Sequence, residues 1–410
     1  MNEISARNAI ILGGGIAGPL AAIALERAGF SAAVYEAHPP PSGIESSSGQ
    51  AIGAWLTVAV NGLAAMRALG VAAEVEACGF PSETIEFLAG SGKRLGALPL
   101  GGRLADGTST HTMKRADLHR VLEAALAARG IPITYAKRVV GVDERGDRVV
   151  ARFEDGSEAE GDLLIGADGV HSRVRHAIDP RAPSPRYNGL GNVGGFAPSS
   201  ASPSPSSSPS PSPSSIMGEH YRMVFGKRAF FGYTPAPSGE VWWFANPPSA
   251  RELPRAELSA IDWRARLIEL FADDRGPMVE LIRATPGKLV YSNQYDLGRV
   301  PTWQRGRVVL IGDAAHAASP SSGQGASMAA EDAVVLASCL RSHAELVEGL
   351  QAFVAARRAR VERVVEYGRK YTSSKAAGPI GRVVRDLMLP LAFRSMRPDS
   401  REWLFDHRVA

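Results

Sequence analysis

Cysteine is nearly absent from this chain: only Cys78 and Cys339 occur among its 410 residues. Two cysteines cannot build the disulfide framework of a small secreted domain, and this pair lacks the spacing of metal ligands. Such usage is typical of a reducing compartment, so we expect a cytoplasmic location. A chain of this length can bury a large core without a disulfide or a bound metal.

The chain also lacks a large excess of charge of one sign: it has 46 Lys and Arg and 42 Asp and Glu, which gives a net charge of +4. That balance gives no indication of nucleic-acid binding. Long hydrophobic runs are missing too. The uncharged stretch 8–25 loosely resembles a signal peptide, but a glycine cluster breaks it, and no segment reaches the ~18 apolar residues of a membrane helix. We therefore expect no stable membrane association.

The beginning of the chain has the pattern of a strand, a turn, a helix and a second strand. Apolar runs at 9–12 and 32–35 flank an Ala- and Leu-rich segment, 16–28, whose apolar residues have helical spacing. A helix between two short apolar runs is typical of a βαβ unit and favours the α/β fold class.

The turn into this helix fits the G-x-G-x-x-G motif, formed by Gly13, Gly14, Gly15, Ile16, Ala17 and Gly18. Gly13 permits the tight turn, Gly15 lets the backbone approach a pyrophosphate, and Gly18 allows close packing of helix and strand. The helix N-terminus offers N–H groups to phosphates. Glu36 closes the second strand, where a carboxylate can bind ribose hydroxyls. The motif predicts a dinucleotide, and NAD and FAD both fit it.

Two later segments each place an Asp at the end of a buried strand. The run 163–167 leads to Asp168-Gly169, and the run 308–311 leads to Gly312-Asp313. The carboxyl ends of such strands are where ligands bind in open α/β sheets. An Ala-rich helix begins near Gly325, and its positive end suits a ring that becomes anionic on reduction. We interpret His316 as a hydrogen-bonding residue, since it has no partner at metal-ligand spacing.

A low-complexity tract at 198–215 contains only Pro, Ser and one Ala. It cannot bury a core, and we expect a disordered insertion. Strand-like segments lie on both sides of it, at 187–196, 221–233 and 241–244. They predict that one sheet continues around the tract.

Together these strings resemble the group A flavoprotein monooxygenases, the family of the para-hydroxybenzoate and salicylate hydroxylases, from about Ala9 to Tyr371. The resemblance implies an α/β fold: a Rossmann-like FAD-binding domain interleaved with a smaller α+β substrate domain, plus a C-terminal helical region. We assign 1–75, 111–180 and 289–340 to the FAD-binding domain, 76–110 and 181–288 to the substrate domain, and 341–410 to the helical region. One departure from the family pattern is Val60-Asn61-Gly62, where a Pro-Asn-Ala-type string is usual.

The resemblance also implies roles for single residues in these strings. It places Glu36 at the adenosine ribose, Arg115 at the FAD phosphates, Asp168 between FAD and the nicotinamide cofactor, Gly312 and Asp313 at the ribityl chain, Gly325 and Ala326 at the flavin pyrimidine edge, and Pro320 beside the substrate.

The implied reaction hydroxylates a phenolic or polyketide-like small molecule. NADPH or NADH reduces FAD, O2 adds to the reduced flavin, and the resulting hydroperoxide transfers one oxygen to the ring, without a metal. A base could activate a phenol, and the candidates lie in the substrate region: His220, Tyr221, Arg222 and Tyr233. In an alternating strand, half of the side chains face away from any one ligand.

Other interpretations stay open. The same fold could serve a halogenase or a prenyl-chain reductase, although 241–244 lacks the halogenase string Trp-x-Trp-x-Ile-Pro. A non-catalytic redox sensor could use the Pro/Ser tract to bind a partner. We interpret the basic run Arg357-Arg358-Ala359-Arg360 as a solvated or interdomain helix face. The tail 382–410 could cover the substrate domain or a partner chain, and the protein could be a monomer or a homodimer.

Overall fold

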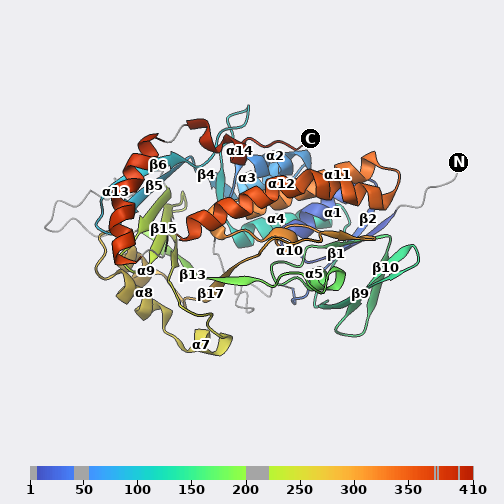
Figure 1. Cartoon of the computed structure of the whole chain (residues 1–410), viewed down its shortest axis with the longest axis horizontal. Helices are drawn as coiled ribbons and strands as arrows, with labels where there is room; N and C mark the ends of the chain where they lie inside the picture. Colours follow the sequence, from blue (N-terminus) through green and yellow to red (C-terminus); the bar gives the residue numbers. More distant parts are fainter. Residues whose placement is uncertain are drawn as a thin grey trace.

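The computed structural model describes residues 7–40, 55–199, 221–373, 375, 378–395 and 398–409. The described chain forms two large sheets at opposite ends of an elongated molecule, and a long helix, α12 (Leu346–Ser373), runs from one end toward the other (Figure 1). The predicted α/β fold class is confirmed.

The first large sheet has six strands in the order β18-β19-β12-β1-β2-β8. All neighbours from β19 to β8 pair in parallel, and β18 is an antiparallel edge. The bounds of its strands are β1 (Asn8–Leu12), β2 (Ser31–Tyr35), β8 (Ile133–Thr134), β12 (Leu163–Gly166), β18 (Gln304–Arg305) and β19 (Val308–Leu310). The predicted βαβ unit and both later buried strands are therefore confirmed, and their carboxyl ends meet at one edge.

The second large sheet has seven strands in the order β17-β13-β16-β15-β14-β5-β6. The bounds of its strands are β5 (Thr84–Ala89), β6 (Arg94–Pro99), β13 (Arg186–Pro198), β14 (Tyr221–Phe225), β15 (Phe230–Pro235), β16 (Glu240–Asn246) and β17 (Tyr291–Asp296). One sheet thus continues on both sides of the Pro/Ser tract, as predicted. The tract itself lies outside the described residues beyond Ser199. The predicted strand 221–233 is two antiparallel strands, because the chain reverses at 226–229.

The other strands of the described chain form two small sheets. One has the order β3-β7-β4 and the other β11-β10-β9. Their bounds are β3 (Trp55–Val58), β4 (Gly79–Pro81), β7 (His111–Lys114), β9 (Val139–Arg145), β10 (Arg148–Phe153) and β11 (Glu158–Gly161).

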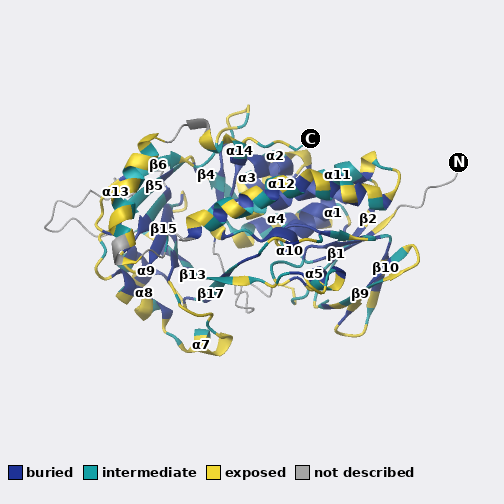
Figure 2. Ribbon diagram, viewed as in Figure 1, coloured by how far each residue is buried: buried dark blue, intermediate teal, exposed yellow. Residues whose placement is uncertain are grey.

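The helices pack mainly against the six-stranded sheet and beside α12. Their bounds are α1 (Ala17–Arg27), α2 (Val60–Ala68), α3 (Ala72–Ala77), α4 (Arg115–Ala128), α5 (Arg173–Ile178), α7 (Arg255–Ala260), α8 (Trp263–Phe271), α9 (Met278–Ala284), α10 (Asp313–His316), η2 (Pro320–Ser322), α11 (Gly325–Ser342), α13 (Pro379–Ser395), η4 (Pro398–Arg401) and α14 (Glu402–Phe405). Buried residues concentrate in the sheets and in the helices that cover them (Figure 2).

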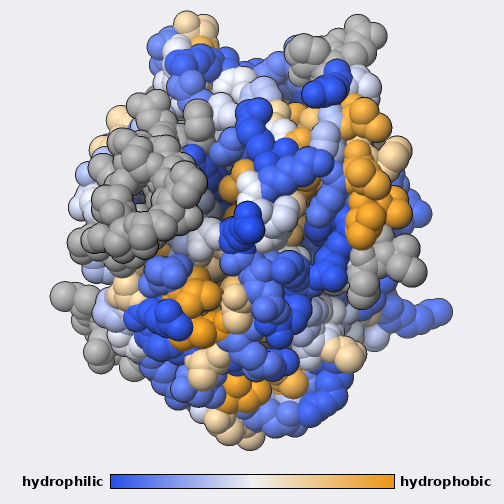
Figure 3. Space-filling model, turned by 90° about the vertical axis from the view of Figure 1, so that its left-hand side faces the viewer, coloured by the Kyte–Doolittle hydropathy of each residue, from blue (hydrophilic) through white to orange (hydrophobic). Residues whose placement is uncertain are grey.

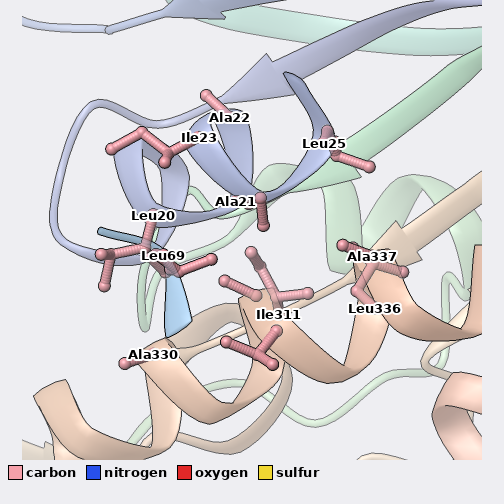
Figure 4. Packing of buried hydrophobic residues seen from close by; sticks show 14 of the residues in the cluster. Leu20, Ala21, Ala22, Ile23, Leu25, Leu69, Ile311, Ala330, Leu336 and Ala337 are labelled. Atoms are coloured by element: carbon pink, nitrogen blue, oxygen red, sulfur yellow. The ribbon is translucent and has the colours of Figure 1, made fainter. Parts of the chain in front are cut away.

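The core of the six-stranded sheet is closed by α1 and α11, which pack against each other. Small residues on both helices, such as Ala21 and Ala330, allow the close approach that Figure 4 shows, and Leu20 and Ile311 fill the space between them. All four side chains are fully buried. This packing fixes the N-terminus of α11 near the glycine loop that opens α1.

The seven-stranded sheet has two different faces. One, which we call the helix face, carries Phe231 and Trp243 and is covered by α8 and α9: Phe231 packs edge-on to Phe271 at 5.2 Å, and Trp243 donates to Thr285 Oγ1 at 2.7 Å. The other, which we call the front face, carries Phe230, Trp242 and Phe244. Strand alternation alone produces this division.

Helix α13 covers the front face at the β6 edge, where Phe393 stacks on Phe87 at 5.1 Å. The tail therefore covers the sheet of the substrate region, which is one of the two expected arrangements. Its outward side is apolar and exposed, and consists of Val383, Val384, Leu387, Met388 and Leu391. Figure 3 looks onto this end of the molecule and shows apolar patches between charged groups. No helix of the described residues is both long and apolar enough to cross a membrane.

Candidate active site

The glycine loop after β1 is closed on one side and open on the other. Gly13 has φ +115°, and a Cβ added there would lie 2.3 Å from the carbonyl oxygen of Ala167. A Cβ on Gly18 would lie 1.9 Å from the carbonyl oxygen of Gly13. A Cβ on Gly15 would have no protein atom within 4 Å. The loop is therefore held tightly against the sheet while its Gly15 side leaves room for a ligand, beside Ile16 and Ala17 at the start of α1.

Glu36 lies directly beside this loop, because β2 ends next to β1. Its Oε2 accepts from the Gly14 N–H at 2.7 Å, and its Oε1 accepts from the His38 N–H at 2.9 Å. The carboxylate is thus oriented by two backbone donors at the mouth of the loop. Free lone pairs remain to accept from the hydroxyls of a ribose.

Replacing Glu36 by Ala should weaken FAD binding by about 1–3 kcal/mol, roughly 5- to 150-fold, because the ribose hydroxyls lose a charged acceptor. Titration of the apoprotein with FAD, followed by flavin fluorescence, measures the change. Glu26→Ala, at an exposed position of α1, is the matched control and should bind FAD like the wild type. Equal affinities of the two variants would remove Glu36 from the cofactor site.

Gly312 and Asp313 reach the same loop from β19. A Cβ on Gly312 would lie 2.8 Å from the Cβ of Ala17 in the first turn of α1. The Asp313 side chain is exposed to solvent, yet it sits deep within the protein. Desolvation by that surrounding protein raises the pKa of its carboxyl, while the charges of His316 and Arg115 oppose the shift. Asp313 is thus a carboxylate that solvent reaches although protein surrounds it closely.

Arg115 is the first residue of α4 and is exposed. Its charge acts on Asp313 and on His119, one turn further along α4. Desolvation, followed by the charge of Arg115, lowers the pKa of His119 to about 4, so this imidazole is neutral at pH 7. Arg115 is therefore a cation near Asp313 at the start of α4, and its contact with the FAD phosphates stays a prediction.

Gly325, Ala326 and Pro320 lie at and just before the start of α11. Gly325 begins α11, is exposed, and has open space where a Cβ would stand. Ala326 is half-buried behind it, and Pro320 is exposed at the start of η2. The η2 turn is held by Thr372 near the end of α12, whose hydroxyl lies 2.5 Å from that of Ser319.

Asp168 has a structural task at the end of β12. Its Oδ2 accepts from the backbone N–H groups of Arg173 and Val174 at 2.8 and 3.1 Å, and so holds the turn into α5. Ser172 caps that helix and accepts from the Arg175 N–H at 2.9 Å. Burial raises the pKa of the Asp168 carboxyl, and these hydrogen bonds oppose the shift. A contact of Asp168 with either cofactor stays a prediction.

Beneath Gly312 lies a buried ionic network that the sequence analysis missed. The Asp332 carboxylate accepts from the Gly312 N–H at 2.9 Å and from Arg357 Nε at 2.8 Å, and it lies 2.6 Å from His316 Nε2. The hydrogen-bonding role of His316 is confirmed. Arg357 also pairs with Glu331 at 2.7 Å. The network ties α10, α11 and α12 together directly under the candidate site.

Of the two alternatives for the basic run, a solvated or an interdomain helix face, Arg357 takes the second, because its side chain is only 1% exposed and pairs with acids of α11, in the segment assigned to the FAD-binding domain. Its neighbour Arg360 also turns inward and binds Glu331 at 2.7 Å. Asn61 extends the network, donating to Gln324 Oε1 at 2.9 Å and to Glu331 Oε1 at 2.8 Å. Asn61 belongs to the string Val60-Asn61-Gly62, which departs from the family pattern. It therefore holds Gln324, the residue that precedes α11, in place.

Two of the predicted base candidates lie on the wrong face of the seven-stranded sheet. Tyr233 is 3% exposed and belongs to the core under α8, and Arg222 is its cross-strand neighbour. Arg222 forms an ion pair with Glu86 at 3.0 Å. Both therefore point toward the helix face, away from Pro320 and Thr372, and this geometry speaks against a direct role of either residue in catalysis. His220 lies outside the described residues.

The front face instead carries an aromatic surface that continues onto the small sheet with β3. Trp55 of β3 lies 5.1 Å from Tyr221, 6.4 Å from Trp242 and 5.7 Å from Phe244, measured between ring centroids. Tyr221, the remaining predicted candidate, is buried in this cluster, and burial raises the pKa of its hydroxyl far above the usual range. It is therefore a poor base.

The chain matches the family described as "FAD binding domain" over residues 7–367. It is 31% identical to the aurachin C monooxygenase/isomerase of Stigmatella aurantiaca over 360 residues, which cover 87% of this chain and 86% of that protein. It is 32% identical to an FAD-dependent urate hydroxylase of Klebsiella pneumoniae over 368 residues, 88% of each chain. The crystal structure of Klebsiella pneumoniae HpxO with FAD and uric acid matches with a TM-score of 0.78 and 28% identity, covering 94% of this chain and 93% of that one.

The chain therefore belongs to the group A FAD-dependent aromatic monooxygenases, and it is an oxidoreductase with FAD as its cofactor. The described residues fit that cofactor. The open space at Gly15 and Gly325 and the exposed carboxylate of Asp313 leave room and a hydrogen-bond acceptor for a bound dinucleotide.

Proposed function

We propose that this enzyme hydroxylates an aromatic small molecule bound between the front face and the η2 turn, using NADPH or NADH as reductant. Bound FAD, once reduced, supplies the activation of O2 for this chemistry. The observation that supports the proposal is the aromatic surface of Trp55, Trp242 and Phe244, assembled from two sheets, in which both tryptophans are buried and Phe244 is half-buried. Such rings bind a flat aromatic ligand by stacked and edge-to-face contacts.

Different residues of the chain would bind the cofactor, stabilise the reduced flavin and orient the substrate. The glycine loop and Glu36 would hold the dinucleotide end of FAD, and Asp313 with Arg115 its middle. The N-terminus of α11 at Gly325 would stabilise negative charge on the reduced ring through its N–H groups and its dipole. The aromatic surface would exclude water from the reaction and orient the substrate ring.

The rate of flavin reduction by NADPH and by NADH under anaerobic conditions tests this function. We expect that a set of phenols, naphthols and hydroxylated quinolines contains at least one compound that accelerates reduction about tenfold or more. Reduction that is equally fast with every compound and with none would favour an unselective oxidase. A flavin that neither nicotinamide cofactor reduces would overturn the proposal.

A further inference from the structure

Lys375 occupies an unusual position in the described chain. It follows the end of α12 by two residues, and its Nζ lies 4.3 Å from the ring centroid of Phe230 and 5.7 Å from that of Phe244. The same nitrogen donates to Asn246 Oδ1 at 3.0 Å. These three partners belong to β15 and β16, and all of them lie on the front face.

The anchoring of α12 places this lysine beside the candidate substrate site. Three residues before it, Thr372 binds Ser319 and Ser321 at either side of Pro320, at 2.5 and 3.2 Å. Thr372 is thus in contact with the η2 turn, while Lys375, three residues later in the sequence, is in contact with the front face. Of the two rings under Lys375, Phe244 packs on Trp55, and Phe230 belongs to one cluster with Phe393 of α13.

The charge of Lys375 has no counter-ion among the described residues. The side chains that face it from β15 and β16 are Phe230, Phe244 and Asn246, none of which titrates. Burial alone lowers the pKa of its amine to about 7. A half-buried amine with two aromatic rings, one amide and no carboxylate is suited to an anionic partner supplied from outside the chain.

We propose that Lys375 binds the ionisable ring oxygen of the substrate, so that the substrate class is a hydroxyarene or an enolic heteroarene. Neutral Lys375 accepts the hydroxyl proton: the substrate O–H bond breaks, an N–H bond forms, and the electron pair stays on the oxygen. The product is an ammonium–aryloxide pair, in which the ring is more electron-rich than in the neutral compound. Asn246 Oδ1 orients the amine, and Phe230 and Phe244 flank the pair.

This inference rests on the proposed function, and its test must separate the two. The flavin-loaded enzyme is examined with 1-naphthol, 4-hydroxyquinoline, 6-hydroxynicotinate and 7-hydroxycoumarin, each beside its O-methyl ether. Anaerobic flavin reduction by NADPH gives the response to each compound. For 7-hydroxycoumarin, the excitation spectrum of the bound compound also reports whether it is neutral or anionic at pH 7.

The variants are Lys375→Met, which removes the charge and the base, and Lys375→Arg, which keeps a permanent charge without a usable base. Lys370→Met is the matched control, because Lys370 lies on α12, is exposed and pairs with Glu366 on the helix surface. We expect the wild type and Lys370→Met to prefer every hydroxyl compound that accelerates reduction over its ether at least tenfold, and to bind the coumarin as the anion.

Lys375→Met should lose that preference and bind the neutral coumarin, while its FAD content stays that of the wild type. Lys375→Arg should still bind the anion, because its charge stabilises an aryloxide. A merely structural lysine would change thermal stability and FAD content without changing which form of the coumarin binds.

The two hypotheses, the role of Lys375 and the proposed function, fail under different results. If the wild type responds but Lys375→Met keeps both the preference and the anionic coumarin, the inference about Lys375 is wrong and the proposed function stands. If no hydroxyl compound and no ether accelerates reduction of the wild type, the proposed function fails and the inference fails with it.

Discussion

Arg357→Met should lower the free energy of unfolding by about 3–5 kcal/mol, because it leaves two buried carboxylates without their shared cation. Arg357 is 1% exposed, and Glu331 and Asp332 are fully buried. The methionine fills a similar volume but cannot pair with either acid. Urea denaturation of the FAD-loaded protein, followed by circular dichroism, measures the loss.

Arg266→Met is the control for this prediction. Arg266 and Glu269 form an exposed pair on α8, and loss of such a pair costs at most about 1 kcal/mol. If both variants unfolded at the same urea concentration as the wild type, the network under Gly312 would contribute nothing to stability.

The same network predicts that the folded protein loses stability in acid. Desolvation alone would raise the pKa of Asp332, but His316 and Arg357 outweigh it and lower the pKa to about 2. A carboxyl whose pKa is lower in the folded than in the unfolded state stabilises the protein fully above its ordinary pKa. Its contribution is lost as the pH falls from about 4 toward 2, so the melting temperature should fall in that range. Arg357→Met should begin that fall at a higher pH.

Gly15→Ala should cost about 1–3 kcal/mol of FAD binding, roughly 5- to 150-fold, while the apoprotein keeps its stability. The added Cβ meets no protein atom within 4 Å, so folding is not hindered. It would stand in the space that the glycine loop leaves for the cofactor, where the backbone must approach closely. FAD titration and thermal unfolding of the apoprotein measure the two effects separately.

Gly298→Ala gives the matched control, because its Cβ would meet only a proline side chain at 3.9 Å and lies outside the glycine loop. We expect unchanged FAD affinity there. An apoprotein of Gly15→Ala that is itself unstable would show that the glycine serves the fold, and unchanged FAD binding would show that the cofactor does not approach this side of the loop.

Local sequence patterns were sufficient to predict which residues form the cofactor half of the site. Gly13, Gly18 and Glu36 have roles that depend on residues within one βαβ unit, so spacing alone predicts their arrangement. Asp313 was predictable for a related reason, since the carboxyl ends of parallel strands meet at one edge. The structure brings these residues together with Arg115 and Gly325, as the sequence implied.

The substrate half could not be predicted in the same way. Alternation shows which residues of a strand share a face, but not which face meets the site, and so Tyr233 and Arg222 could be named only as candidates. The sequence left open whether Arg357 is solvated or packed between domains, because its acidic partners lie on another helix, more than twenty residues away in sequence. Lys375 gave no signal, since its partners on β15 and β16 are brought to it only by tertiary packing.

The most direct test of the account is turnover under 18O2 with the compound that most accelerates flavin reduction. Mass spectrometry of the product then shows the source of the new oxygen. The account predicts one 18O atom in the hydroxylated ring for each NADPH or NADH consumed by coupled turnover. An oxidised product without 18O, or with oxygen taken from water, would contradict it.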